Sequence, residues 1–122
     1  MGSAVLLYNI PSEKEKAIRA VCEKLSAQAV TVPKSRQGCT VGEALRGEGG
    51  DRPAKRPFDE EMLVLQLPGI LLDFFLQGLQ REGAEVALKA AVTPTNVSWT
   101  ADALVRELHR ERQEFLQNAV KK

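Results

Sequence analysis

The sequence predicts an α/β fold: a small layered sandwich in which a four-stranded, mostly parallel sheet carries helices on both faces. Two continuous apolar runs, residues 4–10 and 62–67, have the length and composition of strands buried on both sides. Two shorter segments, 29–32 and 86–93, supply further strands, and helical patterns lie between the four. Such alternation is typical of parallel sheets. Right-handed crossovers favour strand order 2-1-3-4, with the first and last helices on one face and the middle two on the other.

A ferredoxin-like α+β fold with an extra C-terminal helix is the alternative. The same elements can form an antiparallel sheet in which a long loop joins the second and third strands, but one face of that sheet then lacks a cover. The chain of 122 residues, 43% of them hydrophobic, fits a single domain over 1–122. The layered sandwich is therefore the preferred prediction.

The first helix is predicted over residues 12–27. Ser12 and Glu15 have the spacing of a capping box, in which two side chains satisfy free amides at a helix start. Apolar residues then recur at helical intervals and give the helix one buried face, made by Ile18, Val21, Cys22 and Leu25. The strand at 29–32 is short and is stopped by Pro33, as is typical of a sheet edge.

A second, short helix is predicted where Thr40 and Glu43 repeat the capping-box spacing, and Gly47 ends it. The stretch that follows, 47–60, is rich in Gly, Pro and charge. We expect a flexible surface loop there, because it can bury little apolar surface. A lid over a ligand is one interpretation of this loop. An unselected insertion is the preferred one, because long surface insertions cost little free energy.

The remaining elements are more apolar. The helix at 70–81 is hydrophobic on most of its circumference, so we expect it to be largely buried, with Phe74 and Phe75 in the core. In the strand at 86–93, small residues on one face predict close packing of a helix. The last helix, 99–115, sets an apolar side against a side dense in Arg and Glu.

One run in this half is specific enough to suggest a family. Leu-Lys-Ala at 88–90 is followed by Thr-Pro-Thr-Asn at 93–96 and, three residues later, by Trp99. With these residues the C-terminal half resembles the bacterial family catalogued as domain of unknown function 3783. The resemblance implies a small stand-alone bacterial protein with no assigned activity.

Polar residues follow several of the predicted strands. The carboxyl ends of parallel strands meet at one edge of a sheet, where open α/β folds bind ligands. The residues expected there are Asn9, Ser12, Gly69, Thr93, Thr95 and Asn96, with Lys89 inside the preceding strand. Free amides at helix starts favour phosphate or carboxylate, so the sequence predicts a site for a small anionic ligand. Helix capping and turn formation also account for these residues, and this structural interpretation is preferred.

Composition argues against several classes of protein. Seventeen basic and sixteen acidic residues leave a net charge of +1, which is too small to attract a nucleic-acid backbone. No apolar run approaches the ~20 residues needed to cross a bilayer, and no secretory signal is expected, so we expect a cytoplasmic protein. Cys22 and Cys39 lack metal-site spacing, so neither a metal nor a cofactor is expected. We expect Cys22 to be buried, whereas Cys39 lies in a polar segment that could expose its thiol.

The expected function is that of a small cytoplasmic binding or regulatory module, with a small anionic ligand or a protein partner. Catalysis is less favoured, because the carboxylates of Asp73 and Glu82 lie on helix surfaces away from the predicted edge. The alternative is an enzyme that acts on a small anionic substrate at the C-terminal edge of the sheet, using Lys89, Thr93, Thr95 and Asn96. A third possibility is protein binding through the last helix, which carries Phe115.

Overall fold

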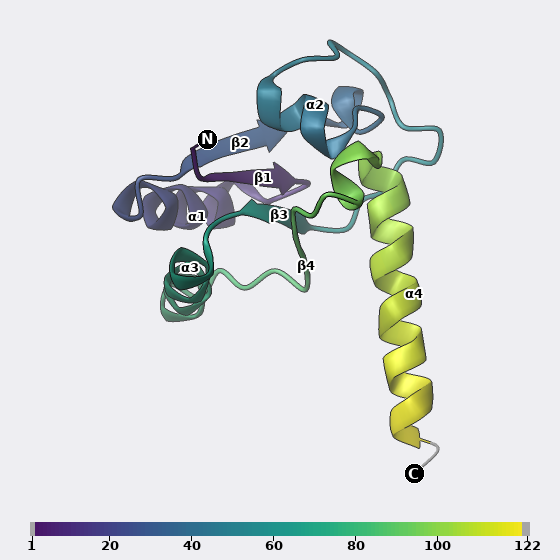
Figure 1. Cartoon of the computed structure of the whole chain (residues 1–122). Coiled ribbons are helices and arrows are strands. Elements are labelled where there is room, and N and C mark those ends of the chain that lie inside the picture. Colours follow the sequence, from purple (N-terminus) through teal and green to yellow (C-terminus); the bar gives the residue numbers. More distant parts are fainter. Residues whose placement is uncertain (1, 121–122) are drawn as a thin grey trace.

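The computed structural model describes residues 2–120, and their side chains up to residue 116 (Figure 1). Four strands alternate with four α-helices and two short 3₁₀ turns. In chain order these are β1 (Ala4–Tyr8), α1 (Ser12–Lys24), β2 (Gln28–Val32), η1 (Lys34–Arg36), α2 (Val41–Arg46), β3 (Met62–Gln66), α3 (Gly69–Arg81), β4 (Leu88–Ala91), η2 (Asn96–Ser98) and α4 (Ala101–Val120).

The strands form one sheet in the order β2-β1-β3-β4, which confirms the α/β prediction and its strand order. The β1/β2 and β3/β4 pairs are parallel. The central β1/β3 pair is antiparallel, with Ala4 opposite Gln66 and Tyr8 opposite Met62. The sheet is therefore mixed, and its two parallel pairs do not fit the antiparallel ferredoxin-like alternative.

The direction of β3 determines which helices share a face. Because β3 runs opposite to β1, a right-handed crossover from β3 to β4 places α3 on the same face as α1. Figure 1 shows these two helices together on one side of the strands, with α2 on the other. The predicted grouping of the first helix with the last was wrong, since it assumed that all four strands run in one direction.

The two βαβ halves share several local features. Pro11 and Pro68 directly precede α1 and α3. Each helix ends near a residue with positive φ, Ser26 at 56° and Gly83 at 66°. The next residue, an alanine in both halves, then donates its amide to a carbonyl of the last helical turn. The sheet is thus built from two similar units that meet at the β1/β3 pair.

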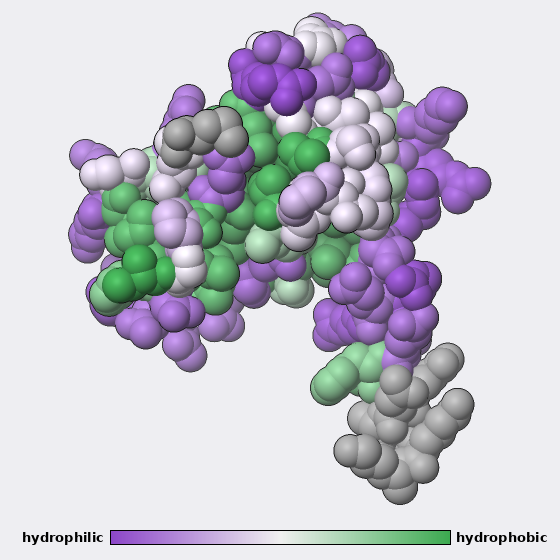
Figure 2. All heavy atoms as spheres, in the orientation of Figure 1, coloured by the Kyte–Doolittle hydropathy of each residue, from purple (hydrophilic) through white to green (hydrophobic). Residues whose placement is uncertain are grey.

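α3 is less buried than its composition predicted. Phe75 is fully buried, as expected, but Phe74 is 52% exposed and Ile70 is 69% exposed. The reason is that α3 lies in an outer layer, with the sheet below it and α1 beside it, so its outer side faces solvent. Hydrophobic surface accordingly remains visible in the region of α3 in Figure 2. The prediction that a helix packs on the small residues of β4 was also wrong. Within the described part of the chain, Lys89 and Ala91 on that face of the edge strand β4 are exposed, so no helix covers them.

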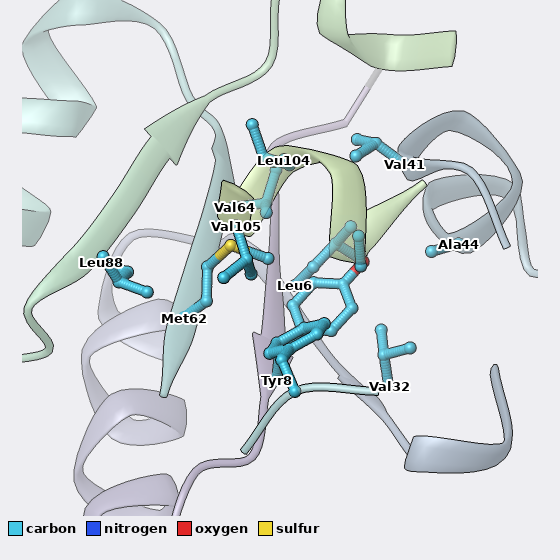
Figure 3. Packing of buried hydrophobic residues seen from close by; sticks show 12 residues of the cluster. Leu6, Tyr8, Val32, Val41, Ala44, Met62, Val64, Leu88, Leu104 and Val105 are labelled. Atoms are coloured by element: carbon cyan, nitrogen blue, oxygen red, sulfur yellow. The ribbon is translucent and has the colours of Figure 1, made fainter. Parts of the chain in front are cut away.

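Two apolar layers cover the sheet. The layer under α1 and α3 gathers Val5, Leu7, Ile18, Val21, Cys22, Leu63, Leu65, Phe75, Leu79, Ala84 and Val86. The opposite layer joins β1 and β3 to α2 and α4 (Figure 3), through Leu6, Tyr8, Val32, Val41, Ala44, Phe58, Met62, Val64, Leu88, Ala101, Leu104 and Val105. Alternate residues of β1 and β3 thus serve opposite faces, which explains why both strands are apolar throughout.

The segment 47–60 contributes to the second layer. Ala54 and Phe58 are buried, and the Phe58 ring lies 6.0 Å from the Tyr8 ring, centroid to centroid. Its backbone also crosses Gly38, whose amide donates to the Arg52 carbonyl at 2.6 Å. Flexibility stays a prediction for the exposed residues of the segment, whereas its buried residues hold it over the α2 and α4 side of the molecule.

Candidate functional site

The residues predicted to bind a ligand fall into two groups that lie at opposite ends of the strands. Asn9 and Ser12 follow β1, whereas Gly69, Thr93 and Asn96 follow β3 or β4. Because β1 and β3 are antiparallel, the carboxyl ends of these strands point in opposite directions. The expected convergence at one edge was therefore wrong, and its physical reason is the reversed central pair.

The residues of the first group, Asn9 and Ser12, serve the structure of the protein itself. Asn9, with φ of 58°, donates from Nδ2 to the carbonyls of Phe58 at 2.9 Å and Glu60 at 3.0 Å. It therefore holds the chain that leads into β3. Ser12 is exposed and begins α1, while Pro11 occupies the N-cap position without a side-chain bond. The capping box predicted at Ser12 was wrong, whereas the one at Thr40 and Glu43 is present in full.

The second group forms a closed turn. Asn96 is 8% exposed, and its Oδ1 accepts the Thr93 amide at 2.9 Å while its Nδ2 donates to the Ala91 carbonyl at 2.9 Å. The Asn96 amide in turn donates to the Thr93 hydroxyl oxygen at 2.9 Å. Both ends of the Asn96 side chain are thus engaged within the protein. Thr95 is exposed beside them, and Lys89 lies on the outer strand, where its ammonium donates to the Val86 carbonyl.

An open groove of about 510 Å³ lies at the carboxyl ends of β3 and β4. In Figure 2 it corresponds to the hydrophobic surface at the middle of the visible face, between the start of β1 and the turn before α4. Of the predicted site residues only Thr93 lines this groove, and none of its lining residues carries a charge. The groove therefore lacks the cations that an anionic ligand needs.

A second cleft has the charge that the first lacks. It measures about 630 Å³ and lies between the 47–60 segment and the start of α4. Four cationic side chains and one carboxylate line it, together with small and polar residues: Arg52, Lys55, Arg56, Arg106, Asp102, Gly38, Pro53 and Thr100. We call it the basic cleft.

Backbone contacts hold the walls of the basic cleft together. Thr40 and Thr100 form an isolated antiparallel bridge, which ties the start of α2 to the start of α4. On the other wall, Gly38 lies so close to the loop that a Cβ there would stand 2.5 Å from the carbonyl oxygens of Arg52 and Pro53. Only glycine fits at this position, so the close approach is built into the sequence.

Two of the arginines are oriented by carboxylates. Arg52 donates to Glu43 at 3.0 Å, and Arg106 donates to Asp102 at 3.4 Å. The Thr40 amide, ahead of the Arg52 charge, lowers the pKa of Glu43. Burial would raise the pKa of Asp102, but hydrogen bonds, the largest from Thr100, outweigh it and lower the pKa. Both carboxylates are therefore ionised and already paired at neutral pH.

The remaining charge in the cleft is uncompensated. Lys55 and Arg56 are exposed and make no ion pair within the part of the chain that the structure describes. The amino terminus of α4 adds the positive end of a helix dipole to the same side. The cleft as a whole thus offers a positive field to an anion, with two fixed guanidinium groups and two free cations.

Sequence reasoning missed this site for a definable reason. Arg52, Lys55 and Arg56 are a local cluster of basic residues, visible in the sequence, but they lie in the stretch interpreted as an insertion. Arg106 is far away along the chain, and only the docking of α4 beside that segment brings it to the cluster. The cluster of basic residues at 52–56 was the signal in the sequence from which the basic cleft could have been found.

Reactive groups are scarce near the cleft. Cys39 lies in the segment that could have exposed its thiol, but it is 1% exposed and its thiol donates to the Gly50 carbonyl. Cys22 is buried as expected, and burial raises the pKa of its thiol to about 11.

Among the described residues, no group of three or more His, Cys, Asp and Glu side chains could hold a metal ion. No helix within 2–120 is long and apolar enough to cross a membrane.

The family comparison bears on the C-terminal half. Residues 62–115 match the model of the family described as Domain of unknown function (DUF3783), which confirms the resemblance over that half. The matched segment begins with β3 and extends into α4, so it contains Asp102 and Arg106 but not the basic residues of the 47–60 segment. No curated protein and no solved structure matches the chain.

Proposed function

We propose that this protein, whose C-terminal half carries the domain of unknown function, is a non-catalytic binding or regulatory module that holds a small anionic ligand in the basic cleft. The observation that supports this proposal is the charge of the cleft: four cations face about 630 Å³, and its one carboxylate is already paired. Among the described side chains, Lys55 and Arg56 are unpaired, and the guanidinium groups of Arg52 and Arg106 each bond their carboxylate through one nitrogen only, so their other N–H donors remain available to an anion.

The arrangement of the cations suits phosphate or carboxylate groups. Arg52 and Arg106 are held in place by carboxylates, and a fixed guanidinium can bind an oxyanion with two parallel hydrogen bonds. Lys55 and Arg56 are exposed cations in the lining of the cleft, and they would attract an anionic ligand through solvent. We therefore expect affinity that falls as salt concentration rises.

The enzyme alternative has less support from the geometry. Asn96 uses both ends of its side chain within its own turn, and Lys89 lies apart on the outer edge of β4. In the basic cleft, Asp102 has a lowered pKa, whereas a general base works best with a pKa near the operating pH. The cytoplasmic and bacterial setting expected from the sequence remains part of the proposal, and the two free thiols suit a reducing compartment.

The proposal is tested by titrating the purified protein with inorganic phosphate, pyrophosphate and citrate, by calorimetry at low salt. Arg106→Gln removes a cleft cation and should weaken binding about tenfold or more, the effect of losing a charged hydrogen bond. Arg110→Gln is the matched control, because Arg110 lies on the same helix but pairs with Glu107 and Glu114 outside the cleft. Equal affinity for wild type and Arg106→Gln, or no binding of any of the three anions, would contradict the proposal.

A further inference from the structure

The lining of the basic cleft is polar almost throughout, which restricts the ligand beyond its charge. Pro53 is the one apolar residue among the described residues that line it, and none of them has an aromatic or branched aliphatic side chain. A nucleobase or an acyl chain would find little to pack on, because such groups bind against aromatic and aliphatic side chains. The volume of about 630 Å³ is nevertheless that of a site for a whole small molecule. The cleft therefore suits an anion that is attached to a polar body.

The charges around the cleft indicate the charge of this ligand. Glu43 offsets the charge of Arg52, and Asp102 offsets that of Arg106. Of the four cations that line the cleft, two positive charges therefore remain. A phosphate monoester carries close to two negative charges at neutral pH, because its second pKa is about 6. A phosphate group matches the remaining charge better than a single carboxylate does.

Asp102 adds a hydrogen-bond acceptor to this cationic cleft. Its side chain is 9% exposed, and the bond that it accepts from Arg106 is long, at 3.4 Å. Burial raises the pKa of Asp102, but hydrogen bonds from Thr100, from its own amide and from Arg106 lower it overall, so the carboxyl group is ionised. A carboxylate has about four acceptor positions, and these three bonds leave one of them to a ligand.

Helix capping alone does not explain the carboxylate at position 102. Thr40 and Thr100 bridge the starts of α2 and α4, and each hydroxyl accepts the amide three residues further on, at 3.1 Å and 3.4 Å. Both helices therefore begin with the same kind of cap. Two residues after the threonine, α2 has Gly42, whereas α4 has Asp102. The carboxylate is thus present only at the helix start that lines the basic cleft.

A hydroxyl group is a better partner for Asp102 than an ammonium group. Both donate hydrogen bonds to a carboxylate, but an ammonium would be repelled by the four cations that line the same cleft. A hydroxyl is uncharged and avoids this repulsion. Its hydrogen bond to an ionised acceptor is about twice as strong as one to a neutral acceptor. The lining therefore favours an anion that also carries hydroxyl groups.

We propose that the ligand of the basic cleft is a phosphate monoester of a sugar or another polyol, whose phosphate meets the cations while one of its hydroxyls donates to Asp102. This inference rests on the proposed function and adds the chemical class of the ligand to it. Asp102 then acts in two directions. It strengthens the binding of a hydroxylated anion through the hydrogen bond, and it weakens the binding of a plain anion through charge repulsion.

The test is calorimetry of the full chain at low salt with glycerol phosphate, glucose-6-phosphate, methyl phosphate and aminoethyl phosphate. The two hydroxylated esters should bind about tenfold more tightly than methyl phosphate, which has the same charged group but no hydroxyl. Aminoethyl phosphate should bind no more tightly than methyl phosphate. Asp102→Asn should weaken binding of the hydroxylated esters and leave the affinity for methyl phosphate unchanged or higher. Circular dichroism checks the fold of the variant, and the comparison of esters in the wild type does not depend on it.

Glu107→Gln is the matched control, because Glu107 is a carboxylate of the same helix that pairs with Arg110 and does not line the cleft. It should leave the preference for hydroxylated esters at its wild-type value. Equal affinity of the wild type for methyl phosphate and both hydroxylated esters would overturn this inference, although the basic cleft would still be an anion site. An Asp102→Asn variant that binds all four esters equally more weakly would overturn it too, since Asp102 would then only hold the cleft together. If no ester and no inorganic anion binds, the proposed function fails and this inference fails with it.

Discussion

Asn96 illustrates how one residue can be predicted in two ways that only its contacts distinguish. The sequence placed it at a strand end, where it could have bound a ligand or closed a turn. In the structure its amide group bonds to Thr93 and Ala91 on the same turn, with both distances at 2.9 Å. These bonds make the turn before α4 rigid, and through that turn they fix the position of the helix that carries Arg106.

Asn96→Ala should therefore destabilise the protein rather than remove a ligand contact. The substitution leaves the Thr93 amide and the Ala91 carbonyl without their partners, and the expected loss in free energy of unfolding is about 2 kcal/mol. Urea denaturation measures it. Thr95→Ala, at the exposed neighbouring position, should change the free energy by less than about 0.5 kcal/mol. Equal stability of the two variants would show that the turn does not depend on Asn96.

Asp102 gives a pH dependence whose sign follows from its lowered pKa. A carboxyl with a lower pKa in the folded state than in the unfolded state stabilises the protein above its ordinary pKa of 3.8, and this contribution is lost as the pH falls through the folded value. Asp102→Asn should reduce stability at pH 7, and the difference from wild type should shrink as the pH falls towards 3. Urea midpoints measured at several pH values test this. A difference that stays constant with pH would show that Asp102 acts without its charge.

At the scale of single helices and strands, the sequence pattern correctly predicted those features that depend only on neighbouring residues. The capping box at Thr40 and Glu43 and the end of α2 at Gly47 depend on residues a few positions apart, and both are present. At Ser12 the same spacing failed, because Pro11 occupies the N-cap position and Glu15 accepts a hydrogen bond from Thr31 of β2 instead. The strand β2 thus competes with the start of α1 for the Glu15 side chain. The helical spacing of residues in the sequence does not reveal this competition.

The contact between α1 and α3 yields a prediction that belongs to neither helix alone. A Cβ at Gly78 would stand 2.7 Å from Cγ1 of Val21, whose β-branched side chain is stiff in a helix. Gly78→Ala should therefore destabilise the wild type by about 1 kcal/mol or more, as overpacking does. In a Val21→Ala background the clash is gone, and the same change should stabilise by up to about 1 kcal/mol through helix propensity. Thermal unfolding of the four proteins checks this reversal, and the same sign in both backgrounds would contradict it.

At the scale of the whole molecule, the strand order could be predicted but the strand directions could not. Apolar runs identify β1 and β3 as central strands, and this alone places β2 and β4 at the edges. Both directions of β3 bury the same residues, so the sequence pattern does not distinguish them. The helix grouping and the convergence of Asn9 with Asn96 depended on that direction. The basic cleft depends on it as well, because its lining joins Arg52 to Asp102 and Arg106 of α4, and α4 packs on the same face of the sheet as α2.

The antiparallel centre of the sheet also predicts that the family-matched segment, 62–115, is not a folding unit. Without β1, the central strand β3 becomes an unpaired edge, and Leu63 and Leu65 lose the apolar layer that the first half shares with them. We expect a peptide of residues 62–115 to be unfolded in water by circular dichroism and by the narrow spread of its amide proton resonances. Adding a peptide of residues 1–61 should restore the native spectrum, since the β1/β3 pair and both apolar layers then re-form. Cooperative unfolding of the 62–115 peptide alone would contradict this, and would mean that β3, α3, β4 and α4 suffice to make a core.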